Sequence, residues 1–307
     1  MDIKRTSAEI FYSAVYWALR GLRGCALLFP RRFILWLGSS LGVFTYGVLR
    51  WRRKVALENL SLAFGTDRED PGIKRIARDC FRNIGRHFFE AFYMNNLGEL
   101  SRKISFEGEE HLKKAKEKGK GVLILTAHFG SWELMASAAS LFYEPIYVVI
   151  KELDFPPLDR LVRELREATG NRCTTKEKSM RRILALLAQN ASLGILLDQN
   201  IDWKDGVFVN FFGRPACTNK GLALLAMKSG AAVIPVFIFH QGKGKHVIRC
   251  YPEIPLADTG DRTKDMEEST RVYTEMIESV VREVPDHWFW VHKRWKTRPE
   301  CPWPKRQ

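Results

Sequence analysis

The sequence has few cysteines, and none of them form close pairs. Its 307 residues include six cysteines, and no two show the C-x-x-C spacing of redox motifs or the clustered spacing of zinc sites. They are Cys25, Cys80, Cys173, Cys217, Cys250 and Cys301. This spacing argues against a disulfide-stapled secreted scaffold. We expect reduced thiols, no bound metal and a body that faces the cytosol.

Acidic residues are also scarce relative to basic ones. The chain has 35 Asp and Glu against 49 Lys and Arg, a formal net charge of +14. Residues 1–54 alone carry ten Lys and Arg against two acidic residues. A basic excess attracts polyanions, and nucleic acid, anionic lipid headgroups and acidic carrier proteins all qualify. Charge alone does not choose among them.

Long runs without charged residues are rare, and the most notable one is short for a segment that crosses a membrane. The stretch "FILWLGSSLGVFTYGVL" at 33–49 is seventeen residues long, at the lower limit for crossing a bilayer. It could span the membrane, dip into one leaflet, lie along the surface, or be a buried core helix. Flanking arginines and terminal aromatic residues favour an interfacial position. We expect residues 1–54 to be a membrane-associated helical segment, retained because it lacks a signal-peptide cleavage site.

The remainder, residues 55–307, shows the alternation of an α/β domain. Apolar residues recur at helical spacing over 52–65 and 71–94, and again near 157–168, 179–189, 219–229 and 264–284. Short apolar runs fall between the later helices: "GVLILT", "PIYVVI", "LGILLD", "AAVIPVFIF" and "KHVIRCYPEI". Strands interleaved with helices predict a mostly parallel central sheet flanked by helices. In such folds the working groups lie where strands end and helices begin.

One such place is "TAHFGSWE" at 126–133. Gly130 permits a tight turn and Ser131 is a good N-cap, so the helix is predicted to begin at Trp132. His128 then stands on the preceding loop and Glu133 in the first helical turn. The carboxylate could fix the imidazole tautomer and leave the other nitrogen as a base. Alternatively, the histidine is satisfied by a carbonyl group and the glutamate only stabilises the helix start.

The stretch "HFGSWE" has the H-x4-D/E form of the glycerolipid acyltransferase superfamily, and the surrounding chain resembles the late acyltransferases of lipid A biosynthesis. Four more stretches carry the resemblance: "ALENLSLAFG", "DFPPLDRLVRELR", "LLDQN…GVFVNFFGRPA" and "HWFWVHKRWKTRP". The resemblance implies a glycerolipid acyltransferase-like fold. It also implies acyl transfer from acyl carrier protein to a hydroxyl of a lipid A precursor at the cytoplasmic face of the inner membrane. Membrane lipids would be partners, nucleic acid would not, and a thioester donor requires no cofactor.

The resemblance also suggests roles for site residues. His128 is the expected base, and Glu133 is expected to orient it. Asp198 ends a predicted strand where similar proteins carry an aspartate. Arg166 matches a basic position suited to a phosphate or carboxyl group. Lys151 stands where many relatives have arginine, which weakens any bidentate contact there.

Two later stretches are also expected to contribute. In "FFGRPA", Gly213 is expected to form a tight turn that points Arg214 toward an anionic substrate group. Asn210 replaces the proline often found before this element. The aromatic and basic stretch at 287–299 suits either a membrane interface or packing under the sheet.

Other functions remain open on sequence grounds. The acceptor could be another glycolipid, or the donor acyl-CoA. The stretch from Gly38 to Gly42 matches the G-x-S-x-G of serine hydrolases around Ser40, although it lies in the apolar N-terminal run. The net charge by itself would also allow a non-enzymatic basic binding protein.

Overall fold

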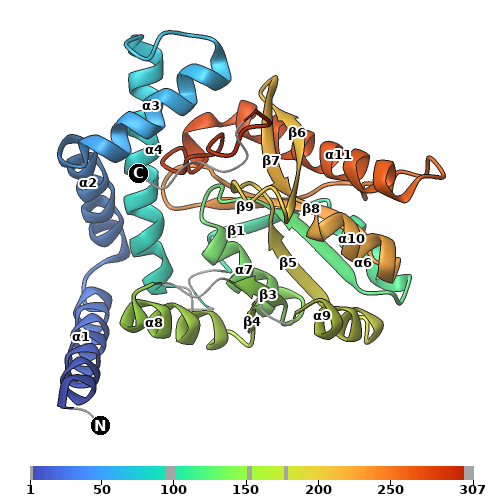
Figure 1. Ribbon diagram of the computed structural model, residues 1–307. Helices are drawn as coiled ribbons and strands as arrows, with labels where there is room; N and C mark the ends of the chain where they lie inside the picture. The colour runs from blue at the N-terminus through green and yellow to red at the C-terminus, as the bar shows by residue number, and fades with distance from the viewer. Residues whose placement is uncertain (1–2, 94–97, 99–100, 151–153, 176–178, 301–307) are drawn as a thin grey trace.

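The computed structural model describes residues 3–93, 98, 101–150, 154–175 and 179–300 (Figure 1). A seven-stranded sheet in the order β1-β9-β8-β2-β5-β3-β4 forms its centre. Strands β8 and β9 pair antiparallel, and the other neighbours pair parallel. The mostly parallel sheet predicted from the sequence is therefore confirmed. The strands are β1 (Ile104–Glu107), β2 (Val122–Thr126), β3 (Tyr147–Ile150), β4 (Arg172–Thr175), β5 (Ser192–Leu196), β8 (Ala232–His240) and β9 (His246–Cys250).

Helices cover both faces of this sheet. Along β2, Leu123 and Leu125 pack into one buried cluster, with residues of α3, α4, α9, α10 and α11. Val122 and Ile124 pack into a second, with residues of α1, α6, α7 and α8. Since successive side chains of a strand point to opposite faces, this explains why β2 is apolar at nearly every position. The helices are α1 (Ile3–Leu27), α2 (Arg31–Val48), α3 (Arg50–Phe64), α4 (Pro71–Glu90), α6 (Glu109–Glu117), α7 (Trp132–Phe142), α8 (Pro156–Glu167), α9 (Ser179–Ala188), α10 (Gly221–Ser229) and α11 (Arg262–Glu283), with short 3-10 turns η1 (Ala91–Tyr93) and η2 (Pro285–His287).

Three features of the sheet region were not predicted. The short strands β1 and β4 have too few residues to give a clear pattern. The stretch containing Gly213 forms a separate antiparallel hairpin of β6 (Gly206–Phe211) and β7 (Arg214–Asn219). Its turn is the pair Phe212 and Gly213, with φ of 54° and 71°. Two positive φ values are typical of a type I′ turn, so the tight turn expected at Gly213 is present.

The first four helices lie to one side of the α/β body, with α1 reaching farthest from it (Figure 1). The division expected between residues 54 and 55 falls inside α3. Among the described residues, no single helix is both long and apolar enough to cross a membrane. Helices α2 and α3 meet the requirement only when taken together, and a bend of 91° separates them.

The G-x-S-x-G stretch lies within α2, where its glycines serve helix packing. A Cβ added at Gly42 would lie 2.1 Å from the Phe81 carbonyl oxygen, and one at Gly38 would lie 2.7 Å from the Gly85 carbonyl oxygen. Helices α2 and α4 therefore cross backbone to backbone. Ser40 stands on a regular helix and not at a strand-to-helix turn, which removes the structural basis for a serine nucleophile there.

The first helices expose many large apolar side chains. Trp36, Phe44 and Trp51 are each about 60% exposed, at 61%, 64% and 58%. Other large apolar side chains of α1, α2 and their connections are 38% to 85% exposed: Ile10, Phe11, Tyr12, Trp17, Leu22, Leu27, Leu28, Phe29, Phe33, Leu37, Leu41, Val48 and Leu49. Soluble monomers rarely expose so much contiguous apolar surface. A wholly buried core helix is thus the wrong interpretation of the stretch at 33–49.

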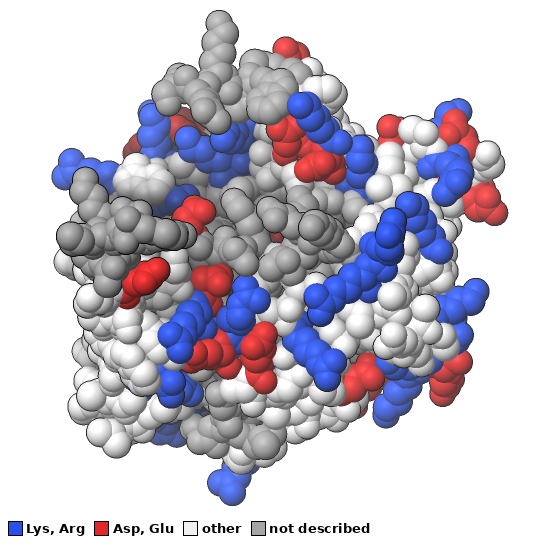
Figure 2. All heavy atoms as spheres, turned by 60° about the horizontal axis from the view of Figure 1, so that its bottom comes forward, with Lys and Arg blue, Asp and Glu red and all other residues white. Residues whose placement is uncertain are grey.

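On the face shown in Figure 2, Lys and Arg side chains are interspersed with Asp and Glu among the described residues, and uncharged areas lie between them.

Candidate active site

The register of β2 against β5 brings His128 and Asp198 together. Thr126 pairs with Leu196, and the Leu197 N–H donates to the Thr126 carbonyl at 3.1 Å. His128 follows Thr126 by two residues and Asp198 follows Leu196 by two residues, so both lie at the carboxyl edge of the sheet. Residues 70 positions apart in the chain therefore become neighbours.

The Asp198 carboxylate holds His128 in a fixed orientation. Its Oδ1 accepts from the imidazole Nδ1 at 2.8 Å, and its Oδ2 accepts from the His128 backbone N–H at 3.0 Å and from the Trp288 indole at 2.8 Å. The Asp198 side chain is 2% exposed and that of His128 21%. Burial by itself would raise the pKa of Asp198, but the imidazole and these hydrogen bonds outweigh it and hold this pKa below its ordinary value.

This arrangement leaves the other imidazole nitrogen available. Because the charged Asp198 only accepts hydrogen bonds, Nδ1 carries the proton and Nε2 keeps its lone pair. The Gln199 amide nitrogen lies 3.2 Å from Nε2 and can donate to it. The geometry is that of a general base whose tautomer is set by a buried carboxylate.

Glu133 does not have the role expected from the sequence. Its carboxylate accepts two hydrogen bonds from Arg166, from Nε to Oε2 at 2.7 Å and from Nη2 to Oε1 at 2.5 Å, and a third from the Trp132 indole at 3.1 Å. The first turn of α7 thus directs Glu133 toward α8, while Nδ1 of His128 is already bound by Asp198. The expectation that Glu133 orients the imidazole is corrected: Asp198 does so.

The Glu133–Arg166 pair also changes the expectation for Arg166. Its guanidinium binds a carboxyl group, as its chemistry suggested, but that group belongs to the protein. Burial would lower the pKa of Arg166, but the hydrogen bond and charge of Glu133 raise it above its ordinary value. Both side chains remain partly exposed, at 19% for Arg166 and 22% for Glu133. The pair joins α7 to α8 beside the catalytic loop.

The loop that carries His128 is held from two sides. Gly130 has φ of 56°, and a Cβ there would lie 2.2 Å from the Ile238 carbonyl oxygen. The Gly130 N–H donates to the His287 carbonyl at 2.9 Å, and the Phe289 N–H donates to the His128 carbonyl at 3.1 Å. Helix α7 begins at Trp132, as predicted, although the Ser131 side chain makes no capping hydrogen bond.

In the late aromatic and basic stretch, the tryptophans and Arg294 pack inside the protein, whereas Lys293, Lys296 and Arg298 are exposed. Trp288, Trp290 and Arg294 are at most 1% exposed, and Trp295 is 8% exposed. Arg294 donates to the Cys217 carbonyl at 2.8 Å and the Gln199 carbonyl at 3.3 Å. Burial lowers its pKa to about 10. Of the two alternatives left by the sequence, packing against the sheet is correct for these residues, and the stretch supports the site from behind.

The remaining predicted residues lie elsewhere or are not described. Lys151 lies outside the described residues. Arg214 follows the hairpin turn, where its Nε donates to the Leu62 carbonyl of α3 at 3.0 Å. In the part of the chain that the structure describes, it makes no hydrogen bond to His128, Asp198 or Glu133. A contact between Arg214 and an anionic substrate group stays a prediction.

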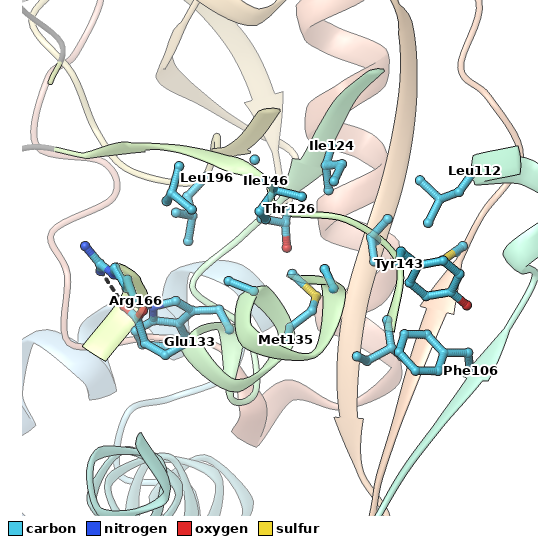
Figure 3. Close-up of a pocket in the computed structure, with 18 residues that line it drawn as sticks. Phe106, Leu112, Ile124, Thr126, Glu133, Met135, Tyr143, Ile146, Arg166 and Leu196 are labelled. Carbon is cyan, nitrogen blue, oxygen red and sulfur yellow. Dashed lines mark hydrogen bonds and ion pairs between the residues drawn. The ribbon is translucent and has the colours of Figure 1, made fainter. Parts of the chain in front are cut away.

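An apolar cavity begins at the Glu133–Arg166 pair. We call it the sheet cavity. Figure 3 shows the charged pair at one end, Met135, Thr126 and Ile146 along the middle, and Phe106, Leu112 and Tyr143 at the other end. It lies between α7 and the sheet, and its lining is almost wholly apolar except at the charged pair (Figure 3).

Comparison with known proteins bears on this site. The sequence profile of the family described as bacterial lipid A biosynthesis acyltransferase matches residues 2–297. The chain belongs to this family. It is therefore an acyltransferase, and its α/β core with a mostly parallel sheet houses the site described above.

Individual relatives are distant but match over much of their length. The lipid A biosynthesis lauroyltransferase of Escherichia coli (strain K12) is 26% identical over 291 residues, covering 92% of each chain. A phosphatidylinositol mannoside acyltransferase of Mycolicibacterium smegmatis is 26% identical over 226 residues, covering 72% of each. Among solved structures, the 1-acyl-sn-glycerophosphate acyltransferase PlsC of Thermotoga maritima aligns with a TM-score of 0.40 at 12% identity, over 83% of this chain and 99% of that one. A TM-score of 0.40 is too low to support a functional assignment.

Sequence reasoning missed two residues that contact the His128–Asp198 pair. Gln199 stands directly after Asp198 in the quoted "LLDQN" stretch, and its position beside a strand end was the available signal. Trp288 lies 90 residues from the aspartate it binds. Its only signal was the density of tryptophans around it, which suits a membrane interface equally well.

Proposed function

We propose that the protein transfers a fatty acyl chain from acyl carrier protein to a hydroxyl of a lipid A precursor, on the cytoplasmic side of the inner membrane. The observation that carries the proposal is the His128–Asp198 pair, in which Nε2 keeps its lone pair next to the Gln199 amide and the Trp132 ring separates the imidazole from an apolar cavity. Family membership supports the reaction class. The lipid A precursor, the carrier protein and the membrane location are parts of the proposal.

The chemistry follows from the geometry. Nε2 of His128 takes the proton from the acceptor hydroxyl as its oxygen attacks the thioester carbonyl carbon. The new C–O bond forms, the C–S bond breaks, and the imidazolium returns the proton to the departing thiolate. Asp198 stabilises the imidazolium while it exists. Because the thioester is already an activated donor, the mechanism needs no covalent enzyme intermediate, metal or redox cofactor.

The sheet cavity suits the donor chain. Its mouth at Glu133 is linked to His128 through Trp132, whose ring lies 5.1 Å from the imidazole between centroids. A chain inserted toward Phe106 and Tyr143 would leave its thioester near Nε2. On this proposal the Glu133–Arg166 pair shapes the mouth of the cavity and fixes α8 against α7.

The exposed apolar face of α1, α2 and the start of α3 supports membrane attachment. A surface patch this large marks a membrane or protein interface. Exposed basic residues of this region, such as Arg32 and Arg50, would meet anionic headgroups, each contributing about 1 kcal/mol near a charged surface. Attachment along the membrane surface, without a span, fits helices that bend by 91° between α2 and α3.

A different glycolipid acceptor is the second candidate. The relatives include phosphatidylinositol mannoside acyltransferases, so the matched sequence features are compatible with another sugar lipid. The reaction at His128 would be the same. Acyl-CoA in place of the carrier protein is a further variant of the same chemistry.

Mass spectrometry of lipid A tests the proposal. Lipid A from cells that carry the wild-type gene should be heavier by one acyl chain than lipid A from cells that lack it, and His128→Ala should resemble the deletion. Purified enzyme should prefer acyl carrier protein over CoA as the carrier of the same chain. An unchanged lipid A profile, together with transfer to another glycolipid, would select the second candidate.

A further inference from the structure

A second apolar cavity, of about 240 Å³, lies between α4, α8 and the start of α7. We call it the helix cavity. Its walls are Ile84 and Phe88 of α4, Leu158 and Val162 of α8, and Phe289. The mechanism above does not use this space.

The two cavities share two wall residues close to the base. Trp132 and Glu133 line both of them. The ring centroids of Trp132 and Phe289 lie 5.1 Å and 6.1 Å from that of His128. An apolar group in either cavity could therefore place its polar end near Nε2.

The helix cavity borders the outward-facing apolar helices. Phe88 is 49% exposed, and its ring lies 5.7 Å from that of Phe92, between centroids. Phe92 is buried with Ala26 and Ile34, which belong to α1 and α2. On the other wall, α8 is fixed to α1 by hydrogen bonds of 2.7 Å and 2.6 Å from the Tyr16 hydroxyl to the two carboxylate oxygens of Glu164. The cavity thus lies next to the surface proposed to meet the membrane.

The sheet cavity has different surroundings. It runs under α7 to residues of β1, α6 and the end of α7 (Figure 3). A donor carried by a water-soluble protein and an acceptor held in a membrane approach from different environments. Each of these amphiphiles also needs its own apolar space while their reacting groups meet at one base.

We propose that the helix cavity holds an acyl chain already present on the acceptor lipid, while the sheet cavity holds the chain being transferred. This assignment rests on the proposed acyl transfer between two lipids. It predicts that acceptor selectivity and donor chain length are set by different residues.

Matched variants separate the two cavities. Val162→Trp fills the helix cavity from α8, and Ala139→Leu narrows the sheet cavity from α7. The assay measures kcat/KM with acyl carrier protein donors of increasing chain length. The acceptors are a lipid A precursor with full-length acyl chains and the same precursor with shortened chains.

For Val162→Trp, kcat/KM for the full-length acceptor should fall about tenfold or more, since each methylene kept out of an apolar site costs about fourfold in binding. The short-chain acceptor and the donor-length preference should change little. Ala139→Leu should give the reverse: a shift toward shorter donors and an unchanged ratio between acceptors. Ala91→Leu, on the α4 side of the helix cavity, should repeat the Val162→Trp pattern if the larger substitution disturbs folding.

The outcomes distinguish the two proposals. Wild-type enzyme that acylates neither precursor would overturn the lipid A function and this assignment with it. The cavity assignment alone would be overturned by a different result. In that case the wild-type enzyme acylates both precursors, but Val162→Trp and Ala91→Leu lower kcat/KM for the two acceptors equally or shift the preference for donor length.

Discussion

Replacing Asp198 with asparagine tests the catalytic geometry directly, because the two residues have the same shape. In the wild type, one carboxylate oxygen accepts from both the His128 N–H and the Trp288 indole. These two donors should keep the asparagine oxygen in that place. The amide NH₂ would then face Nδ1, at the position where a carboxylate oxygen accepts at 2.8 Å today.

The consequence is a change of tautomer. With an NH₂ group opposite it, Nδ1 must accept a hydrogen bond, so the proton moves to Nε2 and blocks the base. Loss of a positioned general base lowers rates by about 10²- to 10⁴-fold, or about 3–5 kcal/mol of transition-state stabilisation. Folding should change much less, since the hydrogen bonds to the oxygen persist.

The assay is kcat for acyl transfer across the pH range, with Asp258→Asn on the exposed surface as the control for the same chemical change. The low pKa of Asp198 keeps this carboxylate charged throughout the working range. If Asp198→Asn keeps kcat within about threefold of wild type while Glu133→Gln loses more, Glu133 is the orienting residue after all, and the argument from hydrogen bonds is wrong.

Three further predictions concern packing, membrane attachment and pH. Gly42→Ala should destabilise the protein by about 1–3 kcal/mol in chemical unfolding, because its Cβ has no room at the helix crossing. Gly47→Ala, with nothing within 4 Å of its Cβ, should be neutral or stabilising by up to about 1 kcal/mol. Equal effects of the two changes would contradict the close crossing. Serine at both Trp36 and Phe44 should shift the protein from sedimented anionic vesicles to the supernatant, since each buried aromatic contributes about 2 kcal/mol. Unchanged sedimentation would place the membrane contact elsewhere. Burial lowers the pKa of His287 to about 4 from an ordinary 6.5, so the unfolded state binds more protons between these values. The contribution of His287 to the free energy of unfolding should therefore fall by about 3 kcal/mol as pH drops from 6.5 to 4, and His287→Gln should make the total loss of stability over this range smaller by about that amount.

The correction at Glu133 shows where sequence spacing misleads. Five residues separate it from His128, and the H-x4-E pattern invites a direct contact between them. The turn at Gly130 and the start of α7 at Trp132 instead direct the glutamate toward Arg166, 33 residues farther along. Sequence proximity and a known motif identified the right neighbourhood, but they did not identify the hydrogen-bond partners.

The sequence by itself determined what depends on local pattern and burial. The apolar run of β2 required a sheet covered on both faces, since Val122 and Leu123 both had to be buried. Gly130 permitted the tight turn that places His128 on a loop, because glycine adopts its φ of 56° without strain. The apolar, basic character of the first helices likewise follows from composition alone.

Tertiary structure decided which distant residues meet. Whether Asp198 or Glu133 binds the imidazole depended on β2 pairing with β5, and periodicity within one strand carries no information about its neighbour. The stretch that contains Trp288, Trp290 and Trp295 has the composition of a membrane interface. These side chains are nevertheless buried, and the Trp288 indole donates to the Asp198 carboxylate. Strand order and cavity shape arise from interactions between segments far apart in the chain, so no single stretch of the sequence encodes them.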